Sequence, residues 1–392
     1  MALDYGRVLD GVGSTARRTD WTMVLAACAL VAIGITFIWS ASSRPDETGW
    51  FPLTGLALKQ ALWAVVALAA MAVVLVTPYR FFARFGYTFY FLAMAGLLYV
   101  LVLGPEINYA RRWIALGPPG RHFLTVQPSE FAKVAFVIAL AKFLRYRESY
   151  RRWWGLLVPF GMAALPMVLI AAEPDLGSAL VFGPVVFVLL YVAGARKRHL
   201  LLYAAAPVAV ALVFWLLGVK VLKPYQSDRL LALLDPEGHA GGAGYHLLQS
   251  LAAVCSGGLW GKGLGQGTQG QLGFLPARRT DSIFASIAEE WGFVGATVVL
   301  ALYAYLLFSA MAVARQTRDP FGRLLAVGVM TLLATQALIN TGMTVRLAPV
   351  TGLPLPFVSL GGSSLVANFI ALGILLNVGA RPTLVLSRED FQ

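Results

Sequence analysis

A carboxylate that follows two arginines is the first group in this sequence that could carry out chemistry. Asp281 ends a long, polar, glycine-rich segment, residues 220–281, and comes directly after Arg278, Arg279 and Thr280. A carboxylate can act as a general base towards a hydroxyl group, and arginine side chains bind phosphate and pyrophosphate. An apolar helical pattern begins at residue 282, so Thr280 or Asp281 could instead be the N-cap of that helix. The sequence leaves both catalysis and helix capping open for Asp281.

Two pairs of charged residues lie inside apolar segments that are long enough to be membrane helices. Ionisable groups in such segments are costly, and they usually face the interior of a helix bundle. Glu130 and Lys133 are three residues apart, so they share a helix face and can form an ion pair. Glu289 and Glu290 lie about two turns into the helix that follows Asp281, where one could be a buried structural group and the other could line a cavity. For the first pair, a purely structural role and a functional role both stay open.

A turn and two groups of glycines also stand out between the apolar segments. Asp175 lies in the tight turn 173–178, where its side chain could accept hydrogen bonds from the free N–H groups of the next helix. Glycines cluster at 257–258 and 261–267, without the lysine and hydroxyl residues that end a phosphate-binding loop. We therefore expect close backbone packing, or a loop that re-enters the membrane, at these glycines.

The composition is that of a protein with many membrane-spanning segments. Of its 392 residues, 58% are hydrophobic and 13% are charged, and the mean hydropathy is +0.72. These values lie outside the range of soluble globular domains. About ten segments reach the length of about 20 apolar residues with which a helix crosses a bilayer. They are 21–41, 58–76, 83–103, 127–144, 154–172, 176–194, 199–219, 282–311, 322–343 and 362–380. The predicted fold is an all-α polytopic integral membrane protein with about ten transmembrane helices.

The distribution of lysine and arginine predicts how the chain is oriented in the membrane. Alternate loops are rich in these residues, notably the cluster at 142–152 and the run at 196–198. The opposite short loops carry only Arg44, Lys59, Arg111, Arg112, Arg121 and Arg346. Because basic loops stay in the cytoplasm, both termini are expected to be cytoplasmic and residues 220–281 to be extracellular. The net charge of +12 then reflects this topology and contact with anionic membrane lipids, and it does not indicate nucleic-acid binding.

The whole chain, residues 1–392, is expected to form a single membrane domain. Its predicted parts are a cytoplasmic tail (residues 1–20), transmembrane helices (21–219), an extracellular catalytic loop between helices 7 and 8 (220–281), further transmembrane helices (282–380) and a second cytoplasmic tail (381–392). An outward-facing carboxylate beside arginines suits transfer of a lipid-linked sugar, in which an acceptor hydroxyl loses a proton and a pyrophosphate leaves. Because no nucleotide supplies energy outside the membrane, the donor must already be activated and membrane-bound.

Several short motifs, in the order in which they occur, resemble those of the shape, elongation, division and sporulation (SEDS) family. The resemblance covers residues 20 to 380. The motifs are Arg111-Arg112-Trp113-Ile114, Gln127-Pro128-Ser129-Glu130-Phe131-Ala132-Lys133, Glu173-Pro174-Asp175-Leu176-Gly177, Gln249-Ser250, Gly263-Leu264-Gly265, Phe274-Leu275-Pro276, Thr280-Asp281, Ile287-Ala288-Glu289-Glu290-Trp291-Gly292 and Pro356-Phe357-Val358-Ser359. Within the family, residues 267–276 look more like the members that act in elongation than those that act in division.

The resemblance implies an inverting peptidoglycan glycosyltransferase. Such an enzyme polymerises lipid II, an undecaprenyl-pyrophosphate disaccharide-pentapeptide, at the outer face of the bacterial cytoplasmic membrane. The resemblance further implies a role in cell elongation and rod shape, and a class B penicillin-binding protein transpeptidase as partner. The family's catalytic aspartate falls on Asp281, and its functionally important tryptophan, glutamate, lysine and loop aspartate fall on Trp113, Glu130, Lys133 and Asp175.

Specific roles follow from the resemblance and the residue types together. Asp281 is expected to be the general base, or to organise the acceptor or a bound divalent cation such as Mg²⁺ or Mn²⁺. Three basic residues are candidates for contacting the pyrophosphate: Arg111, Arg112 and Lys133. Glu130 would orient Lys133. Trp113 could stack on a sugar, or it could anchor the chain at the membrane interface, where tryptophan is common.

The chain also departs from the family's usual pattern. Arg279 stands where histidine is usual, Ser282 where a bulky apolar residue is usual, and Leu360 where tyrosine is usual. Two other functions stay open: a transporter that moves lipid II across the membrane, and a non-catalytic scaffold of the cell-wall synthesis complex. A transporter needs polar residues through the full depth of the bilayer, whereas here they cluster towards the outer face. A scaffold would tolerate Asp281→Asn.

Overall fold

The structure is a computed structural model that describes residues 19–42, 55–106, 111–116, 124–145, 151–216, 224–239 and 241–382. Nearly all of the two predicted cytoplasmic tails, residues 1–20 and 381–392, lies outside the described residues. The same holds for Arg44 and Arg121, which entered the prediction of topology.

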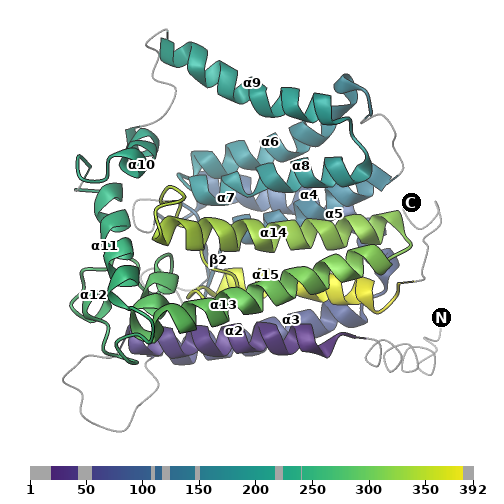
Figure 1. Ribbon diagram of the computed structural model, residues 1–392. Coiled ribbons are helices and arrows are strands. Elements are labelled where there is room, and N and C mark those ends of the chain that lie inside the picture. The colour runs from purple at the N-terminus through teal and green to yellow at the C-terminus, as the bar shows by residue number, and fades with distance from the viewer. Residues whose placement is uncertain are drawn as a thin grey trace.

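Helices make up most of the described chain (Figure 1). In order they are α2 (Trp21–Ser40), α3 (Gly55–Val76), α4 (Tyr79–Leu103), α5 (Pro128–Arg145), the 3₁₀ helix η2 (Trp153–Leu156), α6 (Leu157–Ala172), α7 (Leu176–Leu180), α8 (Phe182–Ala193), α9 (Lys197–Leu216), α10 (Pro224–Leu234), α11 (Ala243–Ser256), α12 (Thr268–Gln271), α13 (Ile283–Gln316), α14 (Pro320–Thr344) and α15 (Gly362–Gly379). The long helices lie side by side as a bundle, while α10, α11 and α12 gather at one end of it (Figure 1). The prediction of a mostly helical membrane protein is therefore confirmed.

Eight of the described helical segments are long and apolar enough to cross a membrane. They are Trp21–Ser40, Gly55–Val76, Tyr79–Leu103, Trp153–Ala172, Leu176–Ala193, Ile283–Gln316, Pro320–Thr344 and Gly362–Gly379. The predicted segment 127–144 also forms a helix, α5, but this helix carries Glu130 near its start and two basic residues, Lys142 and Arg145, in its last turn. Because neighbouring helices enclose α5, its charged side chains do not have to face lipid.

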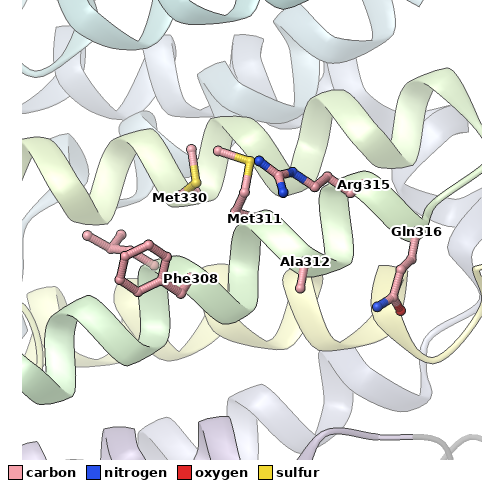
Figure 2. A pocket seen from close by; sticks show the side chains of 7 residues that line it. Phe308, Met311, Ala312, Arg315, Gln316 and Met330 are labelled. Carbon is pink, nitrogen blue, oxygen red and sulfur yellow. The ribbon is translucent and has the colours of Figure 1, made fainter.

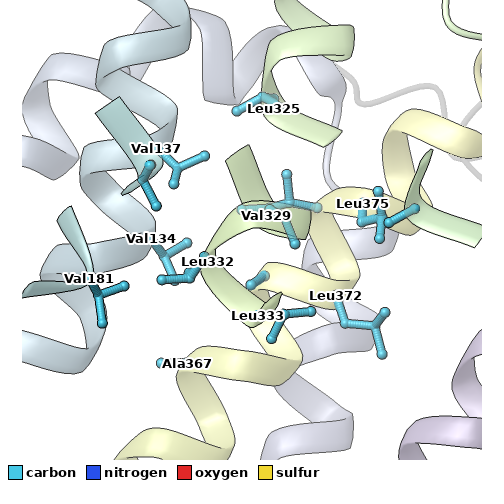
Figure 3. Packing of buried hydrophobic residues seen from close by; sticks show 14 of the residues in the cluster. Val134, Val137, Val181, Leu325, Val329, Leu332, Leu333, Ala367, Leu372 and Leu375 are labelled. Carbon is cyan, nitrogen blue, oxygen red and sulfur yellow. The ribbon is translucent and has the colours of Figure 1, made fainter. Parts of the chain in front are cut away.

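The centre of the bundle is built from α5, α14 and α15. Residues 132–141 of α5 are all buried, and α15 is buried over 83% of its membrane-length window, against 28% for α3 and α4. Figure 3 shows the contacts at this centre, where Val134 and Val137 of α5 lie near Val329 and Leu332 of α14. The outer helices therefore shield a second layer of helices from lipid, and this inner layer can position polar groups.

A short hairpin connects α4 to α5, between the predicted segments 83–103 and 127–144. Strand β1 (Ile114–Leu116) pairs antiparallel with β2 (Leu124–Val126), and Ile114 lies opposite Val126. The hydroxyl of Ser363, at the start of α15, accepts from the N–H of Gln127 at 3.1 Å and donates to the carbonyl of Thr125 at 3.2 Å. These two bonds hold the hairpin against the centre of the bundle.

Helix α13 differs from the predicted uninterrupted helix in two ways. Its N-cap position is taken by Ser282, whose side chain makes no capping hydrogen bond, so the interpretation of Thr280 or Asp281 as the N-cap is wrong. The helix also breaks at Gly292, where φ is 66° and ψ is −163°. Asp281 is thereby free of a capping role.

A buried charged network joins three helices at the bundle end opposite α10–α12. Asp319, the N-cap of α14, accepts from the backbone N–H of Gly322 at 3.1 Å and from the hydroxyl of Tyr79 at 2.9 Å. Its Oδ1 lies 2.8 Å from Nη2 of Arg145, and these two side chains are 1% and 5% exposed. The carboxylate of Asp319 thus neutralises a buried guanidinium and ties the starts of α4 and α14 to the end of α5.

We expect Asp319→Ala to destabilise the protein strongly, because it removes the carboxylate that neutralises a buried arginine. Loss of one partner of a buried ion pair costs about 3–5 kcal/mol. Asp20→Ala is the matched control, since Asp20 is an exposed N-cap that accepts from the N–H of Thr22 at 3.1 Å and its loss should cost about 1 kcal/mol. The measurement is the Tm in detergent. A decrease no larger for Asp319→Ala than for Asp20→Ala would contradict the expectation.

Candidate active site

A polar cavity of about 280 Å³ opens at the bundle end where α10 and α11 lie. Its lining comes from widely separated parts of the chain: Arg112, Trp113, Gln127, Asp175, Ser178, Arg229, Thr280, Asp281, Thr351, Gly352, Pro354, Leu360, Gly361, Ser363 and Ser364. Four of the seven predicted site residues are therefore brought together: Arg112, Trp113, Asp175 and Asp281. The other three do not line this cavity, and neither do Glu289 and Glu290.

The backbone around Asp281 is fixed by groups from two other parts of the chain. The side-chain amide of Asn340, in α14, donates to the carbonyl of Asp281 at 2.8 Å. The hydroxyl of Ser359 donates to the carbonyl of Thr280 at 2.6 Å, and the N–H of Leu360 donates to the carbonyl of Arg279 at 2.9 Å. All three bonds are accepted by main-chain carbonyls of residues 279–281, so the Asp281 carboxylate still faces the cavity.

The pKa of Asp281 is raised to about 6. Burial is the main cause because it disfavours the ionised form, and the negative charge of Asp175 acts in the same direction. A hydrogen bond from Thr280 and the positive charges of Arg229 and Arg112 act in the opposite direction. A carboxylate with a pKa just below neutral is ionised at pH 7 and still basic enough to accept a proton, as a general base must.

Asp175 has both of the roles that its sequence position left open. Its Oδ1 accepts from the N–H of Ser178 at 3.2 Å, so it caps α7 as predicted. Its Oδ2 accepts from the side-chain amide of Gln127 at 3.3 Å, and both residues line the cavity. The cap holds the Asp175 carboxylate in one place, from which its charge acts on Asp281.

The two neighbouring arginines differ in their surroundings. The guanidinium of Arg112 donates to the carbonyl of Glu173 at 2.9 Å and to the carbonyl of Pro174, so it is oriented by the turn that carries Asp175. Arg111 instead points towards solvent, where its side chain is 50% exposed and lies 4.0 Å from the carboxylate of Glu106. The geometry therefore favours Arg112 over Arg111 as an anion-binding group of this cavity.

Glu130 and Lys133 form the predicted ion pair, with Nζ of Lys133 2.7 Å from Oε1 of Glu130. Both side chains are almost completely buried, at 2% and 1% exposed. Their helix, α5, begins directly after Gln127, so the pair lies beneath the cavity and does not line it. The geometry therefore does not favour direct contact between Lys133 and a pyrophosphate in this cavity.

Arg229 was not singled out from the sequence, yet it lines the cavity beside Asp281. It belongs to α10, and its guanidinium donates to the carbonyl of Thr351 at 3.4 Å. Arg346 binds the last carbonyls of the same helix, those of Leu233 and Leu234, at 3.1 and 2.9 Å. The only local signal was a single basic residue that follows Gln226, Ser227 and Asp228 in a polar helix start, which by itself does not indicate a site.

Comparison with known proteins identifies the family. The family described as "Cell cycle protein", which groups FtsW, RodA and SpoVE, matches residues 20–383. The chain belongs to this family. It is 32% identical to the peptidoglycan glycosyltransferase RodA of Treponema pallidum (strain Nichols), over 92% of this chain and 98% of the relative. It is 35% identical to the peptidoglycan glycosyltransferase MrdB of Escherichia coli (strain K12), over 92% and 93% of the two chains.

A solved structure supports the same assignment. One chain of a peptidoglycan synthase complex, in a study of how polymerization and crosslinking are coordinated, matches with a TM-score of 0.78 and 33% identity. The match covers 93% of this chain and 98% of that one. The predicted membership of the SEDS family is therefore confirmed.

Other cavities of this SEDS protein lie between helices. An apolar groove of about 810 Å³ is lined by α3, α4, α5 and α15 together with Ile114 and Val126 of the hairpin. A third cavity of about 500 Å³ lies between α13 and α14 and is lined by Phe308, Met311, Arg315, Gln316 and Met330, among others (Figure 2). The third cavity contains no predicted site residue, whereas the groove meets the polar cavity at the hairpin.

The residues present do not form a protein-only metal site. Among the described residues, no group of three or more histidine, cysteine, aspartate or glutamate side chains is placed to hold a metal ion. Asp281 and Asp175 are the only two carboxylates in the described lining of the polar cavity. Since Mg²⁺ is usually held by one or two carboxylates together with water and substrate phosphates, a divalent cation at Asp281 stays a prediction.

Glu173, beside the cavity, is a buried acid in an unusual state. It is 1% exposed, and neither of its carboxyl oxygens has a hydrogen-bond partner among the described residues. Burial raises its pKa to about 8, with the charge of Asp175 acting in the same direction and that of Arg112 opposing it. Glu173 is therefore protonated and neutral at pH 7.

We expect the protein to become less stable as the pH rises, because the buried Glu173 carboxyl must then lose its proton. The carboxyl of Glu173 ionises near pH 4.5 when unfolded and near pH 8 when folded, so the folded state holds more protons between these values. Stability should therefore fall as the pH rises through this window. Glu173→Gln should flatten the decrease in Tm between pH 5 and 8, whereas the exposed Glu237→Gln should leave it unchanged. An identical pH dependence in the parent and Glu173→Gln would count against the buried neutral acid.

Proposed function

We propose that this chain polymerises lipid II into glycan strands at the outer face of the bacterial cytoplasmic membrane, during cell elongation and maintenance of rod shape. Its relatives bear the name peptidoglycan glycosyltransferase, which confirms the predicted class of enzyme. The observation that carries the proposal is the cavity in which the Asp281 carboxylate, with its raised pKa, lies together with Arg112 and Arg229.

The proposed topology has ten helices that cross the membrane in a single domain. Both termini are cytoplasmic, and residues 220–281 form an extracellular loop that carries α10, α11 and α12. The placement of these three helices at the bundle end that holds the cavity supports this orientation, since the basic clusters at 142–152 and 196–198 follow the opposite ends of their helices.

In the proposed reaction an acceptor sugar hydroxyl attacks the anomeric carbon of a donor lipid II. Asp281 accepts the hydroxyl proton as the new glycosidic C–O bond forms. The bond between the anomeric carbon and the phosphate oxygen breaks, and undecaprenyl pyrophosphate leaves with the bonding electron pair. Attack opposite to the leaving group inverts the anomeric centre. Arg112 and Arg229 stabilise the charge that develops on the pyrophosphate.

The remaining predicted residues support this centre in different ways. Trp113 lines the cavity and offers a flat apolar face on which a sugar can stack. Glu130 and Lys133 act from below, because their ion pair fixes the first turn of α5 directly after Gln127. Asp175 sets the basicity of Asp281 through its charge. Arg111, at the exposed edge, contributes only long-range attraction of an anionic substrate.

The lipid tail of the substrate binds apart from its sugar–pyrophosphate part. Ile114 and Val126 line the apolar groove, while their chain neighbours Trp113 and Gln127 line the polar cavity. Trp113 and Gln127 directly flank the two strands, and successive residues of an extended chain point to opposite faces, so the hairpin separates an apolar side from a polar side. The polyprenyl chain lies in the groove and is covered outside by membrane lipids, and the sugar–pyrophosphate part enters the cavity.

A class B penicillin-binding protein is the proposed partner. A similar chain occurs in a peptidoglycan synthase complex that both polymerizes and crosslinks. Crosslinking is transpeptidase chemistry, which is a different reaction from glycosyl transfer. The proposed complex therefore pairs this chain's glycosyl transfer with a separate transpeptidase.

We expect Asp281→Asn to abolish polymerisation and the parent enzyme to lose activity in acid. Loss of a general base lowers the rate about 100-fold or more. Because the base must be ionised, kcat/KM of the parent should be constant above its pKa and fall as the pH drops below about 6. Asp175→Asn should move this acid limb to lower pH, since Asp175 raises the pKa of Asp281. The measurement uses labelled lipid II and the purified protein with its partner, with glycan strands resolved on a gel.

Each alternative function gives a different result in this assay. Polymerisation by Asp281→Asn at the parental rate would refute the catalytic assignment. Movement of lipid II across vesicles without glycan formation by the parent would indicate a transporter. A parent that neither polymerises nor moves lipid II, but is required for synthesis by the complex, would indicate a scaffold.

We expect Arg229→Met to reduce kcat/KM for lipid II by about tenfold or more, because a hydrogen bond to a charged group contributes about 1.5–3 kcal/mol. Arg346→Met is the matched control, since Arg346 binds the same helix, α10, but does not line the cavity. The control should lower the Tm with little change in kcat/KM. Equal losses of kcat/KM in both variants would mean that Arg229 acts only by placing α10.

A further inference from the structure

The break in α13 separates four backbone groups from their usual helical partners. In an unbroken helix the N–H groups of Phe293 and Val294 would donate to the carbonyls of Glu289 and Glu290. The conformation of Gly292 prevents both of these bonds. Unpaired backbone groups in an apolar surrounding are costly, so each of the four requires another partner.

A segment of the outer loop, residues 258–263, supplies all four partners. Four hydrogen bonds form, written from donor N–H to acceptor carbonyl: Phe293 to Gly258 at 2.9 Å, Val294 to Leu259 at 3.2 Å, Lys262 to Glu289 at 3.1 Å, and Gly263 to Glu290 at 3.0 Å. The loop segment thus takes the place of the missing helical turn. The close backbone packing expected at the glycine clusters is confirmed.

Glycine is required at the closest approaches. A Cβ atom at Gly261 would lie 2.2 Å from the carbonyl oxygen of Glu290, and one at Gly257 would lie 1.9 Å from that of Ala288. At Gly292 a Cβ atom would lie 2.3 Å from the amide nitrogen of Gly261, and both glycines have positive φ. Any side chain at these positions would push the loop off the helix.

The two adjacent glutamates bind the loop a second time, through their side chains. Oε1 of Glu289 accepts from Nζ of Lys262 at 2.8 Å and from the N–H of Gln269 at 2.9 Å, and its Oε2 accepts from the N–H of Gly270 at 3.2 Å. Glu289 is 1% exposed. A buried carboxylate with this many donors is held in one position, and it holds its donors in turn.

Glu290 makes the corresponding contacts on the other side of the helix. Its two oxygens accept from the hydroxyl of Ser40, the last residue of α2, at 2.8 and 2.7 Å. Oε2 also accepts from the N–H of Gly265 at 2.9 Å. The end of α2, the loop and the break in α13 therefore meet at these two side chains.

The same loop and the end of α2 bind the residues that precede Asp281. Gln269 and Gly270, whose N–H groups bind Glu289, accept on their carbonyls from the N–H of Leu275 at 3.0 Å and from the guanidinium of Arg278. Ala41, which follows Ser40, accepts on its carbonyl from the guanidinium of Arg279 at 3.2 and 3.0 Å. Arg278 is thus attached through Gly270 to Glu289, and Arg279 is attached beside Glu290.

We propose that Glu289 and Glu290 are positioning residues for the transfer reaction. They fix the loop and the end of α2, to which Arg278 and Arg279 are bound, and so set the place of the Asp281 carboxylate in a cavity that neither glutamate lines. This inference rests on the proposed function, because it concerns the same reaction at Asp281. It also assigns the departure at Arg279 a role: an arginine reaches the carbonyl of Ala41 with two donors.

The test compares Glu289→Gln and Glu290→Gln with the exposed control Glu237→Gln in the full-length protein, in lipid nanodiscs with its partner. Both variants should lower kcat for lipid II polymerisation by about 10- to 100-fold, the loss expected from a small displacement of a reacting group. KM for lipid II should change by less than about twofold, because neither glutamate contacts substrate. Amide hydrogen exchange should become faster over residues 262–282. The control should match the parent in all three measurements.

A milder variant covers the case in which a glutamine variant does not fold. Lys262→Met removes one partner of Glu289 at a side chain that is 25% exposed, and it should give the same pattern with a smaller loss of kcat. In the double variant Lys262→Met/Glu289→Gln, the loss of kcat should be smaller than the product of the two single losses, because the two side chains act as a unit.

Three outcomes would overturn the proposal: an unchanged kcat in both glutamine variants, a raised KM at constant kcat, or unchanged hydrogen exchange over residues 262–282. A parent protein that fails to polymerise lipid II would instead overturn the proposed function. The exchange measurement does not depend on activity, so it still tests the positioning role in that case.

Discussion

The rest of this structure depends on one constraint. Backbone N–H and carbonyl groups need hydrogen-bond partners, and the surrounding helices offer mainly apolar side chains. Most of the chain meets it by forming helices, which pair these groups internally. Where α13 breaks at Gly292, residues 258–263 provide the partners instead, through four backbone hydrogen bonds. A non-helical loop can therefore lie directly against a membrane helix. The segment that ends at Asp281, the proposed general base, is built on that support.

The same apolar surroundings explain why Asp281 differs from three buried acids that form ion pairs. Glu130 is paired with Lys133, Asp319 with Arg145, and Glu289 with Lys262, all within 2.8 Å. Within the described part of the chain, Asp281 has no cation within ion-pair distance, since the cavity arginines Arg112 and Arg229 donate to backbone carbonyls. A carboxylate that is half-buried and unpaired keeps a raised pKa, which is the property a general base needs.

The two sides of the β-hairpin relate the site to a substrate with two unlike parts. One side faces a cavity with arginines and hydroxyl groups, and the other faces a groove lined almost entirely by apolar side chains. The hydroxyl of Ser363 holds the hairpin to α15 by two hydrogen bonds, so the boundary between these surfaces is fixed. A lipid-linked sugar that lay across this boundary would have its reacting end beside Asp281.

The amino-acid sequence by itself determined the helices, because hydropathy and helix length are local properties that packing does not reverse. It also determined the ion pair of Glu130 with Lys133 and the cap at Asp175, since both depend on spacing within one helical turn. Ordered motifs identified the family, and the resemblance predicted a catalytic role for Asp281. In the ion pair and in the cap, the two partners lie within a few residues of each other.

Only the tertiary structure decided which of these residues share a cavity. Arg229 lies about 50 residues before Asp281 and enters the cavity because α10 packs across the bundle end. Lys133 is withdrawn from the cavity because its carboxylate partner, one turn away, is buried with it. The break at Gly292 was equally invisible, since its partners come from a loop some 30 residues earlier in the chain. Contacts between distant parts of a chain depend on how whole helices pack, and a local sequence pattern does not contain that information.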